Sequence, residues 1–361
     1  MNLRKTIILP RFWAAALALT GLGPLAAAEG GPAAEAPPAF EVWAVMGTEA
    51  SVSMPQAQRS KIPAAAAVTR KVFQDLDTSL SVYKPDSEIS RLNAHAGKGA
   101  FAVSPSTLEV LRISLRYAEL SGGAFDPTVL PLCRLWGFSG GPKPAAPPSG
   151  QALGEVLRRT GHRRLVLSEG KALLDLPGMG IDLGGIAKGY AVDVAFDRLP
   201  AKEYPDVLVN LGGNLRCRGT GRGGGPWVVG VRNPFAPDGI VGVLSLSGGL
   251  AVATSGNYER FVTIGGERLT HILDPRTGRP VTGMAGVTVV CPTAVETDAL
   301  STSLFVLGPV ASRPLLKRCP AARALFIPDH EPLEILVTPG LESVFRPEPG
   351  FEGKVKVLED R

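Results

Sequence analysis

Short apolar runs separated by glycine-rich turns fill the second half of the chain, and this alternation constrains the fold more than any other feature. The runs lie at 165–167, 172–176, 207–211, 227–231, 241–246, 250–254, 268–273 and 287–291. The chain supplies 43 glycines and 32 prolines for the turns between them. Short strands joined by tight turns favour antiparallel pairing, so we expect mainly antiparallel sheet.

Helical periodicity is confined to a few segments. Apolar residues at helical spacing predict helices over 64–80, 107–121, 186–199 and 297–307. Residues 40–54 alternate as a first strand, interrupted by Met46-Gly47-Thr48. Many strands with few helices predict an α+β fold in which the helices lie on one side of the sheet.

The first 28 residues read as a secretory signal. Arg4, Lys5 and Arg11 form a positive region with no acid before Glu29, an apolar stretch follows at 12–25, and Ala26-Ala27-Ala28 offers a cleavage site. We therefore expect a Sec-type signal peptide at 1–28, a flexible leader at 29–39 and a periplasmic protein; an uncleaved anchor is the alternative. Cleavage lowers the formal net charge from +5 to +2, which argues against nucleic acid as a partner.

Two familiar motifs match by chance. Residues 219–224 fit G-x-G-x-x-G, but Pro226 and the apolar Trp227 follow instead of the helix that a dinucleotide site needs. Residues 137–141 fit G-x-S-x-G, but Pro142 excludes the helix of a hydrolase elbow. We expect loops at both places.

The segment 297–302 is a candidate metal site. Asp298 and Thr302 are four residues apart and would share one face of a helix. A carboxylate, a hydroxyl and nearby carbonyls are hard oxygen donors of the kind that Mg²⁺ prefers. The competing interpretation is a helix N-cap at Thr297, with Asp298 near the helix dipole.

Two more segments are candidate sites. In 270–278, Pro275 and Gly278 predict a tight turn that would fix His271 and Asp274, and a histidine near a carboxylate can move protons near neutral pH. A plain hairpin turn is the alternative. In 180–190, Gly184 and Gly185 precede a helix and would let the backbone approach an anion or a metal, or simply pack a strand against that helix.

The order of these segments along the chain resembles the ApbE family of FAD:protein FMN transferases. The resemblance covers about 43–340 and is carried by Met46-Gly47-Thr48, 83–93, 122–128, 135–138, 182–193, 208–214, 253–261, 271–280 and 298–302. It implies the family's T-fold-like α+β architecture: one catalytic unit at 40–345 with a flavin cleft between two subdomains, followed by a C-terminal tail at 346–361.

The resemblance also implies the roles of individual residues. Asp298, Thr302 and the carbonyl of Gly185 would bind Mg²⁺, His271 would be the base, and Asp274 is a possible orienting group. The positions that match the family's FAD site are Met46, Tyr83, Ala124, Phe125, Asp126, Asp182, Lys188 and Ile272. Lys188 stands where some relatives have an acid, and the family's common lipoprotein cysteine is missing.

The implied reaction transfers FMN from FAD to a threonine of another protein and releases AMP. The acceptor would carry a Ser/Thr-Gly-Ala-Thr-like motif and belong to a membrane redox complex, while the enzyme itself would have no membrane anchor after cleavage. Two other functions fit the same residues: an Mg²⁺-dependent FAD pyrophosphatase and a non-catalytic FAD-binding accessory protein.

Overall fold

A nine-stranded sheet is the centre of the molecule. The computed structural model describes residues 36–236 and 238–359. In the described chain the sheet has the order β1-β2-β6-β7-β10-β15-β16-β17-β19, and only the last pair, β17 with β19, is parallel. Its strands are β1 (Ala39–Val45), β2 (Thr48–Met54), β6 (Val207–Leu211), β7 (Asn214–Arg218), β10 (Ala251–Gly256), β15 (Met284–Cys291), β16 (Arg323–Pro328), β17 (Ile335–Val337) and β19 (Val355–Val357).

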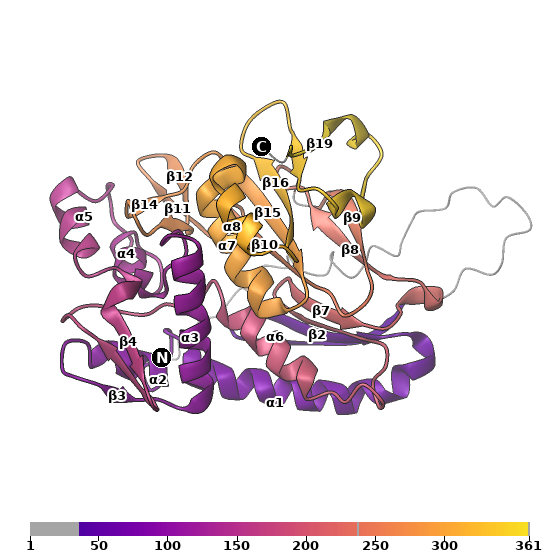
Figure 1. The fold of residues 1–361 in the computed structure, drawn as a ribbon, viewed down its shortest axis with the longest axis horizontal. Helices are drawn as coiled ribbons and strands as arrows, with labels where there is room; N and C mark the ends of the chain where they lie inside the picture. The colour runs from indigo at the N-terminus through magenta and orange to yellow at the C-terminus, as the bar shows by residue number, and fades with distance from the viewer. Residues whose placement is uncertain (1–35, 237, 360–361) are drawn as a thin grey trace, which may run out of the picture.

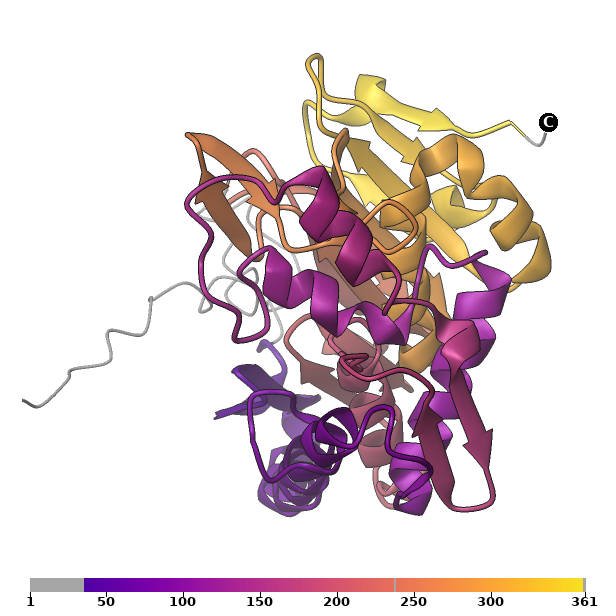
Figure 2. The same ribbon diagram turned by 90° about the vertical axis from the view of Figure 1, so that its left-hand side faces the viewer.

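Helices cover one face of this sheet and a second sheet covers the other. Helices α1 (Ile62–Leu80), α6 (Ala187–Asp197) and α7 (Ala294–Ala311) pack on the first face. Strands β8 (Trp227–Arg232), β9 (Ile240–Leu246) and β18 (Phe345–Pro347) form a three-stranded sheet whose apolar residues share a core with the second face. Helix α1 and the C-terminal strands lie at opposite ends of the molecule (Figure 1 and Figure 2).

Alternation along the strands explains these two cores. On β6, Val207 and Val209 face the helices, while Leu208 between them faces the second sheet. On β10, Ala251 faces the helices and Val252 faces the second sheet. A strand that is buried on both faces reads as a continuous apolar run, because successive side chains point in opposite directions.

Most of the smaller elements lie on one side of the molecule, while α8 (Arg313–Arg318) lies beside α7 (Figure 1). The remaining smaller elements are α2 (Glu88–Ala94), α3 (Pro105–Leu120), α4 (Leu130–Leu135), α5 (Gly150–Leu157), β3 (Phe101–Ala102), β4 (Leu165–Ser168), β5 (Lys171–Leu174), β11 (Phe261–Ile264), β12 (Glu267–Thr270), β13 (Leu273–Asp274) and β14 (Arg279–Pro280). Helices α4 and α5 share a separate apolar cluster with β11, β12 and β13. The hairpin β13–β14 carries the predicted 270–278 turn.

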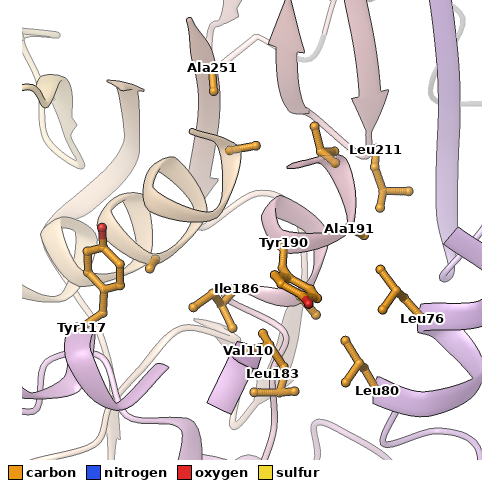
Figure 3. Packing of buried hydrophobic residues seen from close by; sticks show 14 of the residues in the cluster. Leu76, Leu80, Val110, Tyr117, Leu183, Ile186, Tyr190, Ala191, Leu211 and Ala251 are labelled. Carbon is orange, nitrogen blue, oxygen red and sulfur yellow. The ribbon is translucent and has the colours of Figure 1, made fainter. Parts of the chain in front are cut away.

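Helix α6 lies in the middle of the main core. Figure 3 shows Ile186 and Tyr190 between Leu76 and Leu80 of α1 on one side and Tyr117 of α3 on the other. All five side chains are at most 6% exposed. A helix packed on several sides is held rigidly, so residues at its N-terminus have fixed positions.

The sequence predictions of fold class and main elements are confirmed, with one correction. The four predicted helices correspond to α1, α3, α6 and α7, and Met46-Gly47 turns β1 into β2. The segment 346–361 was predicted as a tail, but Val355 and Val357 belong to β19, which pairs with β17 and extends the main sheet. The predicted signal peptide and most of the leader lie outside the described residues. Within the described ranges, every helix is too short or too polar to cross a membrane.

Candidate functional site

Asp298 is buried in the second turn of α7. The helix begins at Ala294 after the N-cap Thr293, so the N-cap interpretation of Thr297 is wrong, and the Thr297 hydroxyl donates to the Ala294 carbonyl at 2.9 Å. Asp298 is 4% exposed, and its Oδ2 accepts the Gly189 N–H of α6 at 2.9 Å. A buried carboxylate that contacts a neighbouring helix is therefore available to a site between α6 and α7.

Helices α6 and α7 are joined at their N-terminal turns. Asp193 of α6 accepts the N–H groups of Ala294 and Val295 at 3.0 and 2.8 Å, and so caps α7 from outside. A Cβ atom on Gly189 would lie 2.2 Å from the Ala294 carbonyl oxygen, so only glycine permits this approach. The junction therefore fixes the position of Gly185, just before α6, relative to that of Asp298 in α7.

Gly185 and Thr302 meet across this junction. A Cβ atom on Gly185 would lie 2.9 Å from Thr302 Oγ1 and 3.4 Å from a ring carbon of Phe125. The Thr302 hydroxyl donates to the main-chain carbonyl of Asp298 at 3.2 Å and lies 3.4 Å from Ser255 Oγ at the end of β10. The structure thus brings Gly185, Asp298 and Thr302 together, and it adds the Ser255 hydroxyl to them.

Lys188 and Asn214 flank the buried carboxylate. The Lys188 ammonium lies 3.4 Å from Asp298 Oδ1 and 3.4 Å from the Gly184 carbonyl oxygen. With its amide turned to suit both neighbours, Asn214 accepts from Lys188 at 3.0 Å and donates to Asp298 Oδ1 at 3.1 Å. Asn214 lies in a segment that carries the family resemblance, but nothing in the sequence pairs it with Asp298.

The donor set here consists of oxygens. Across residues 36–236 and 238–359, no three or more His, Cys, Asp or Glu side chains gather as a metal-binding group. One carboxylate, one hydroxyl and main-chain carbonyls are hard ligands, which suit Mg²⁺ better than a thiolate-seeking or imidazole-seeking metal.

His271 follows β12 and is half-buried. Its Nδ1 lies 3.0 Å from the main-chain carbonyl oxygen of Arg260, and its own N–H donates to the same carbonyl at 3.1 Å. Burial lowers the pKa of His271 to about 4; the nearby charges of Arg260 and Lys188 add to this effect, and the Arg260 carbonyl opposes it. The ring is therefore neutral at pH 7, with the proton on Nδ1 and a free lone pair on Nε2.

Asp274 does not orient His271. Its carboxylate is paired with Arg276, whose Nε and terminal nitrogen lie 2.9 Å from Oδ1 and Oδ2, and Oδ1 also accepts the Arg276 N–H. Its carbonyl accepts from Gly278 at 2.7 Å. The predicted role fails because both carboxylate oxygens serve the turn, and the simple hairpin interpretation holds for this residue.

Two predicted FAD-site residues, Asp182 and Phe125, lie beside Gly184 and Gly185. Asp182 precedes both glycines, and its Oδ1 accepts the Gly184 N–H at 2.8 Å. Phe125 packs beside Gly185, and Ala124 and Ile272 are buried at 1% and 7% exposure. The apolar side chains of Ala124, Phe125 and Ile272 are buried, so their direct effect is on packing.

The Asp126 carboxylate is already saturated. Oδ1 accepts from the N–H and hydroxyl of Thr128 at 2.8 and 2.6 Å, and Oδ2 accepts the His162 N–H at 2.7 Å with the ring Nδ1 at 3.1 Å. A cavity of about 570 Å³ beside it is lined by Gly123, His162, Arg276 and other residues, but not by Asp298 or His271. Asp126 therefore shapes the backbone at this point.

Tyr83 and the turn that carries Met46 and Gly47 lie beside Arg260. The Tyr83 hydroxyl accepts from the Arg260 guanidinium at 3.4 Å, and the same guanidinium lies 4.0 Å from where a Gly47 Cβ atom would be. Tyr83 is 61% exposed, so it is accessible to a ligand. Arg260 lies in a segment that resembles the family, but its contacts with Tyr83 and His271 could not be read from the sequence.

The fold and the site define a class: an α+β protein with an oxygen-rich site at the junction of two helices and a neutral histidine nearby. Residues 46–326 match the ApbE family, and the chain belongs to that family. The site residues found above all lie within this range.

Proteins similar to this chain support the assignment. One is the FAD:protein FMN transferase of Treponema pallidum, 36% identical over 328 residues that cover 84% of this chain and 85% of the relative. Another is the FAD:protein FMN transferase of Vibrio cholerae, 36% identical over 239 residues that cover 66% of this chain and 72% of the relative. The crystal structure of the ApbE protein from Thermotoga maritima superposes with a TM-score of 0.77 at 30% identity, covering 86% of this chain and 99% of that one.

Proposed function

We propose that this protein transfers FMN from FAD to a threonine hydroxyl of an acceptor protein and releases AMP, with Mg²⁺ as cofactor. The threonine oxygen forms a new bond to the phosphorus of the FMN half, and the bond from that phosphorus to the AMP oxygen breaks. The threonine proton passes to Nε2 of His271. Membership of the ApbE family supports this reaction class.

The observation that carries the proposal is the meeting of Gly185, Asp298 and Thr302. The close approach of Thr302 Oγ1 to the Gly185 backbone and the buried Asp298 carboxylate give a set of hard oxygens suited to Mg²⁺. These three residues would hold the ion, which when bound neutralises charge on the diphosphate of FAD. Lys188, beside the same carboxylate, would add a second positive charge toward the phosphates.

His271 is suited to the role of base. Its neutral state at pH 7 and its Nδ1 contact with the Arg260 carbonyl leave Nε2 free to accept a proton. Phe138 lies edge-on to the imidazole, with ring centroids 6.3 Å apart, and limits how far the ring can turn. The orientation of the base therefore depends on a carbonyl and an aromatic ring, and not on a carboxylate.

The finer points of partner and location are also proposals. The acceptor would carry a Ser/Thr-Gly-Ala-Thr-like motif and belong to a membrane redox complex. The positively charged and apolar N-terminal segment supports export to the periplasm. An acceptor domain in the periplasm would be within reach of an enzyme that is not anchored to the membrane.

The FAD site would be lined by Met46, Tyr83, Phe125 and Asp182.

Incubation of the purified protein with FAD, Mg²⁺ and an acceptor peptide tests the proposal. We expect a fluorescent peptide whose mass increases by one FMN, AMP in equal amount, and loss of both products in EDTA. FMN release without labelled peptide would show a pyrophosphatase instead. FAD binding with neither product would show an accessory protein.

A further inference from the structure

The loop at 137–141, after α4, holds a serine in a backbone conformation that favours glycine. Ser139 has φ of 48°, and among the described residues only Met46 shares a positive φ without being glycine. The left-handed region is costly for a residue with a Cβ atom. A serine is therefore expected in this conformation only if its side chain contributes something that glycine lacks.

The loop imposes this conformation. The Phe138 N–H donates to the Cys133 carbonyl at 2.8 Å, and the Gly141 N–H donates to the Phe138 carbonyl at 2.9 Å. A Cβ atom on Gly141 would lie 2.2 Å from the Arg134 carbonyl oxygen, so the loop folds closely back on α4. Glycine would meet the requirement at 139 without strain.

The Ser139 hydroxyl lies beside the buried Cys133 thiol and makes its charged hydrogen bond to a predicted FAD-site residue. The hydroxyl donates to Asp182 Oδ2 at 2.5 Å, while Oδ1 accepts the Gly184 N–H at 2.8 Å. The Asp182 N–H donates to the Pro127 carbonyl at 2.8 Å. Three hydrogen bonds therefore hold Asp182. Two of them involve main-chain groups of Gly184 and Pro127, and the third comes from the Ser139 side chain.

We propose that Ser139 is a positioning residue, which holds the Asp182 carboxylate in the orientation used to bind FAD. The inference rests on the proposed function for the identity of the ligand. Without the hydroxyl, Oδ2 loses its donor, and the carboxylate is held only through Oδ1 by the Gly184 N–H. The strained backbone at 139 is the cost of keeping this donor in place.

Substitutions that separate stability from binding test the proposal. Ser139→Gly removes the hydroxyl and relieves the backbone, so its unfolding temperature should equal or exceed that of the wild type. Ser139→Ala removes the same hydroxyl but keeps the strain. We expect both variants to bind FAD about tenfold more weakly, as measured by quenching of FAD fluorescence, because a hydrogen bond to a charged group is lost.

A double-mutant cycle completes the test. In the Asp182→Asn background, Ser139→Gly should have little further effect on FAD affinity, because the two residues act as a unit. Wild-type affinity in Ser139→Gly, or additive losses in the double variant, would overturn the proposal. Binding is measured without acceptor, so a wild type that binds FAD but labels no peptide would refute the transferase function and leave this test intact.

Discussion

Nδ1 of His271 lies 3.0 Å from the main-chain carbonyl oxygen of Arg260. This contact explains how a histidine without a carboxylate partner is held in one tautomer. The carbonyl accepts the Nδ1 proton, so Nε2 carries the free lone pair. Because the acceptor is a main-chain atom, no side-chain substitution at 260 removes it.

The first prediction concerns the protonation of His271. Its pKa of about 4 in the folded protein lies below the value of about 6.5 expected in the unfolded chain. As the pH falls below 6.5 the unfolded chain takes up this proton first, so the contribution to stability is complete above pH 6.5 and is lost toward pH 4. The loss should approach about 3 kcal/mol at the lower limit.

Denaturant unfolding at pH 7 and pH 5 measures this effect against His271→Gln, whose side chain does not titrate. The wild type should lose more stability than the variant over this interval, and NMR titration of the imidazole should show a midpoint near pH 4. Equal losses in both proteins, or a midpoint near 6.5, would contradict the neutral state of His271 in the folded protein.

The second prediction concerns the carboxylate of Asp298. Asp298→Asn keeps an oxygen that can accept the Gly189 N–H but removes the charge that would attract Mg²⁺. We expect the Mg²⁺-dependent transfer rate to fall by about 100-fold or more with little change in unfolding temperature. Asp197→Ala, whose side chain is 69% exposed at the end of α6, is the matched control. Full transfer by Asp298→Asn would refute the proposed metal site.

The main features of the fold could be predicted because they depend on local pattern. The apolar face of α1 and the continuous apolar runs of β6 and β15 identify buried elements without knowledge of their neighbours. Two-residue strands such as β3 and β13 are too short to show a period. Strand β19 contains only three residues and is defined by pairing with β17, which no local signal reveals.

From the residue pattern alone, the candidate site was predictable only where its residues lie close in sequence; the resemblance to the ApbE family was needed to place Gly185 with Asp298 and Thr302. Asp298 and Thr302 are related by one helical turn, and periodicity is enough to place them together. The contacts of Ser255 and Asn214 with this pair depend on the order of strands in the sheet. Asp274 was assigned to His271 because the two are close in sequence, but the hairpin turns its carboxylate toward Arg276.

The third prediction concerns the Arg260 side chain. Its positive charge lowers the pKa of His271, and its guanidinium contacts the Tyr83 hydroxyl. Arg260→Met keeps the carbonyl that holds the imidazole, so NMR titration should show a higher His271 pKa in a ring that is still ordered. Arg268→Met is the control, because that guanidinium stacks on Phe261 instead. An unchanged His271 pKa in Arg260→Met would exclude the charge effect.

The fourth prediction concerns the contact between α6 and α7. A Cβ atom on Gly189 would lie 2.2 Å from the Ala294 carbonyl oxygen and 2.7 Å from Asp298 Cβ, so Gly189→Ala must push the two helices apart. We expect a loss of about 1–3 kcal/mol in unfolding free energy, together with weaker Mg²⁺ binding, because the same movement separates Gly185 from Thr302. Gly154→Ala in α5 is the matched control: its Cβ atom would meet nothing within 4 Å, so helix propensity alone should stabilise the protein slightly. Scanning calorimetry of both variants measures the change in stability, and comparison with Gly154→Ala separates helix propensity from packing. Titration of Mg²⁺ into each variant measures the change in metal affinity. A Gly189→Ala variant as stable as the wild type would show that the junction of α6 and α7 is not rigid.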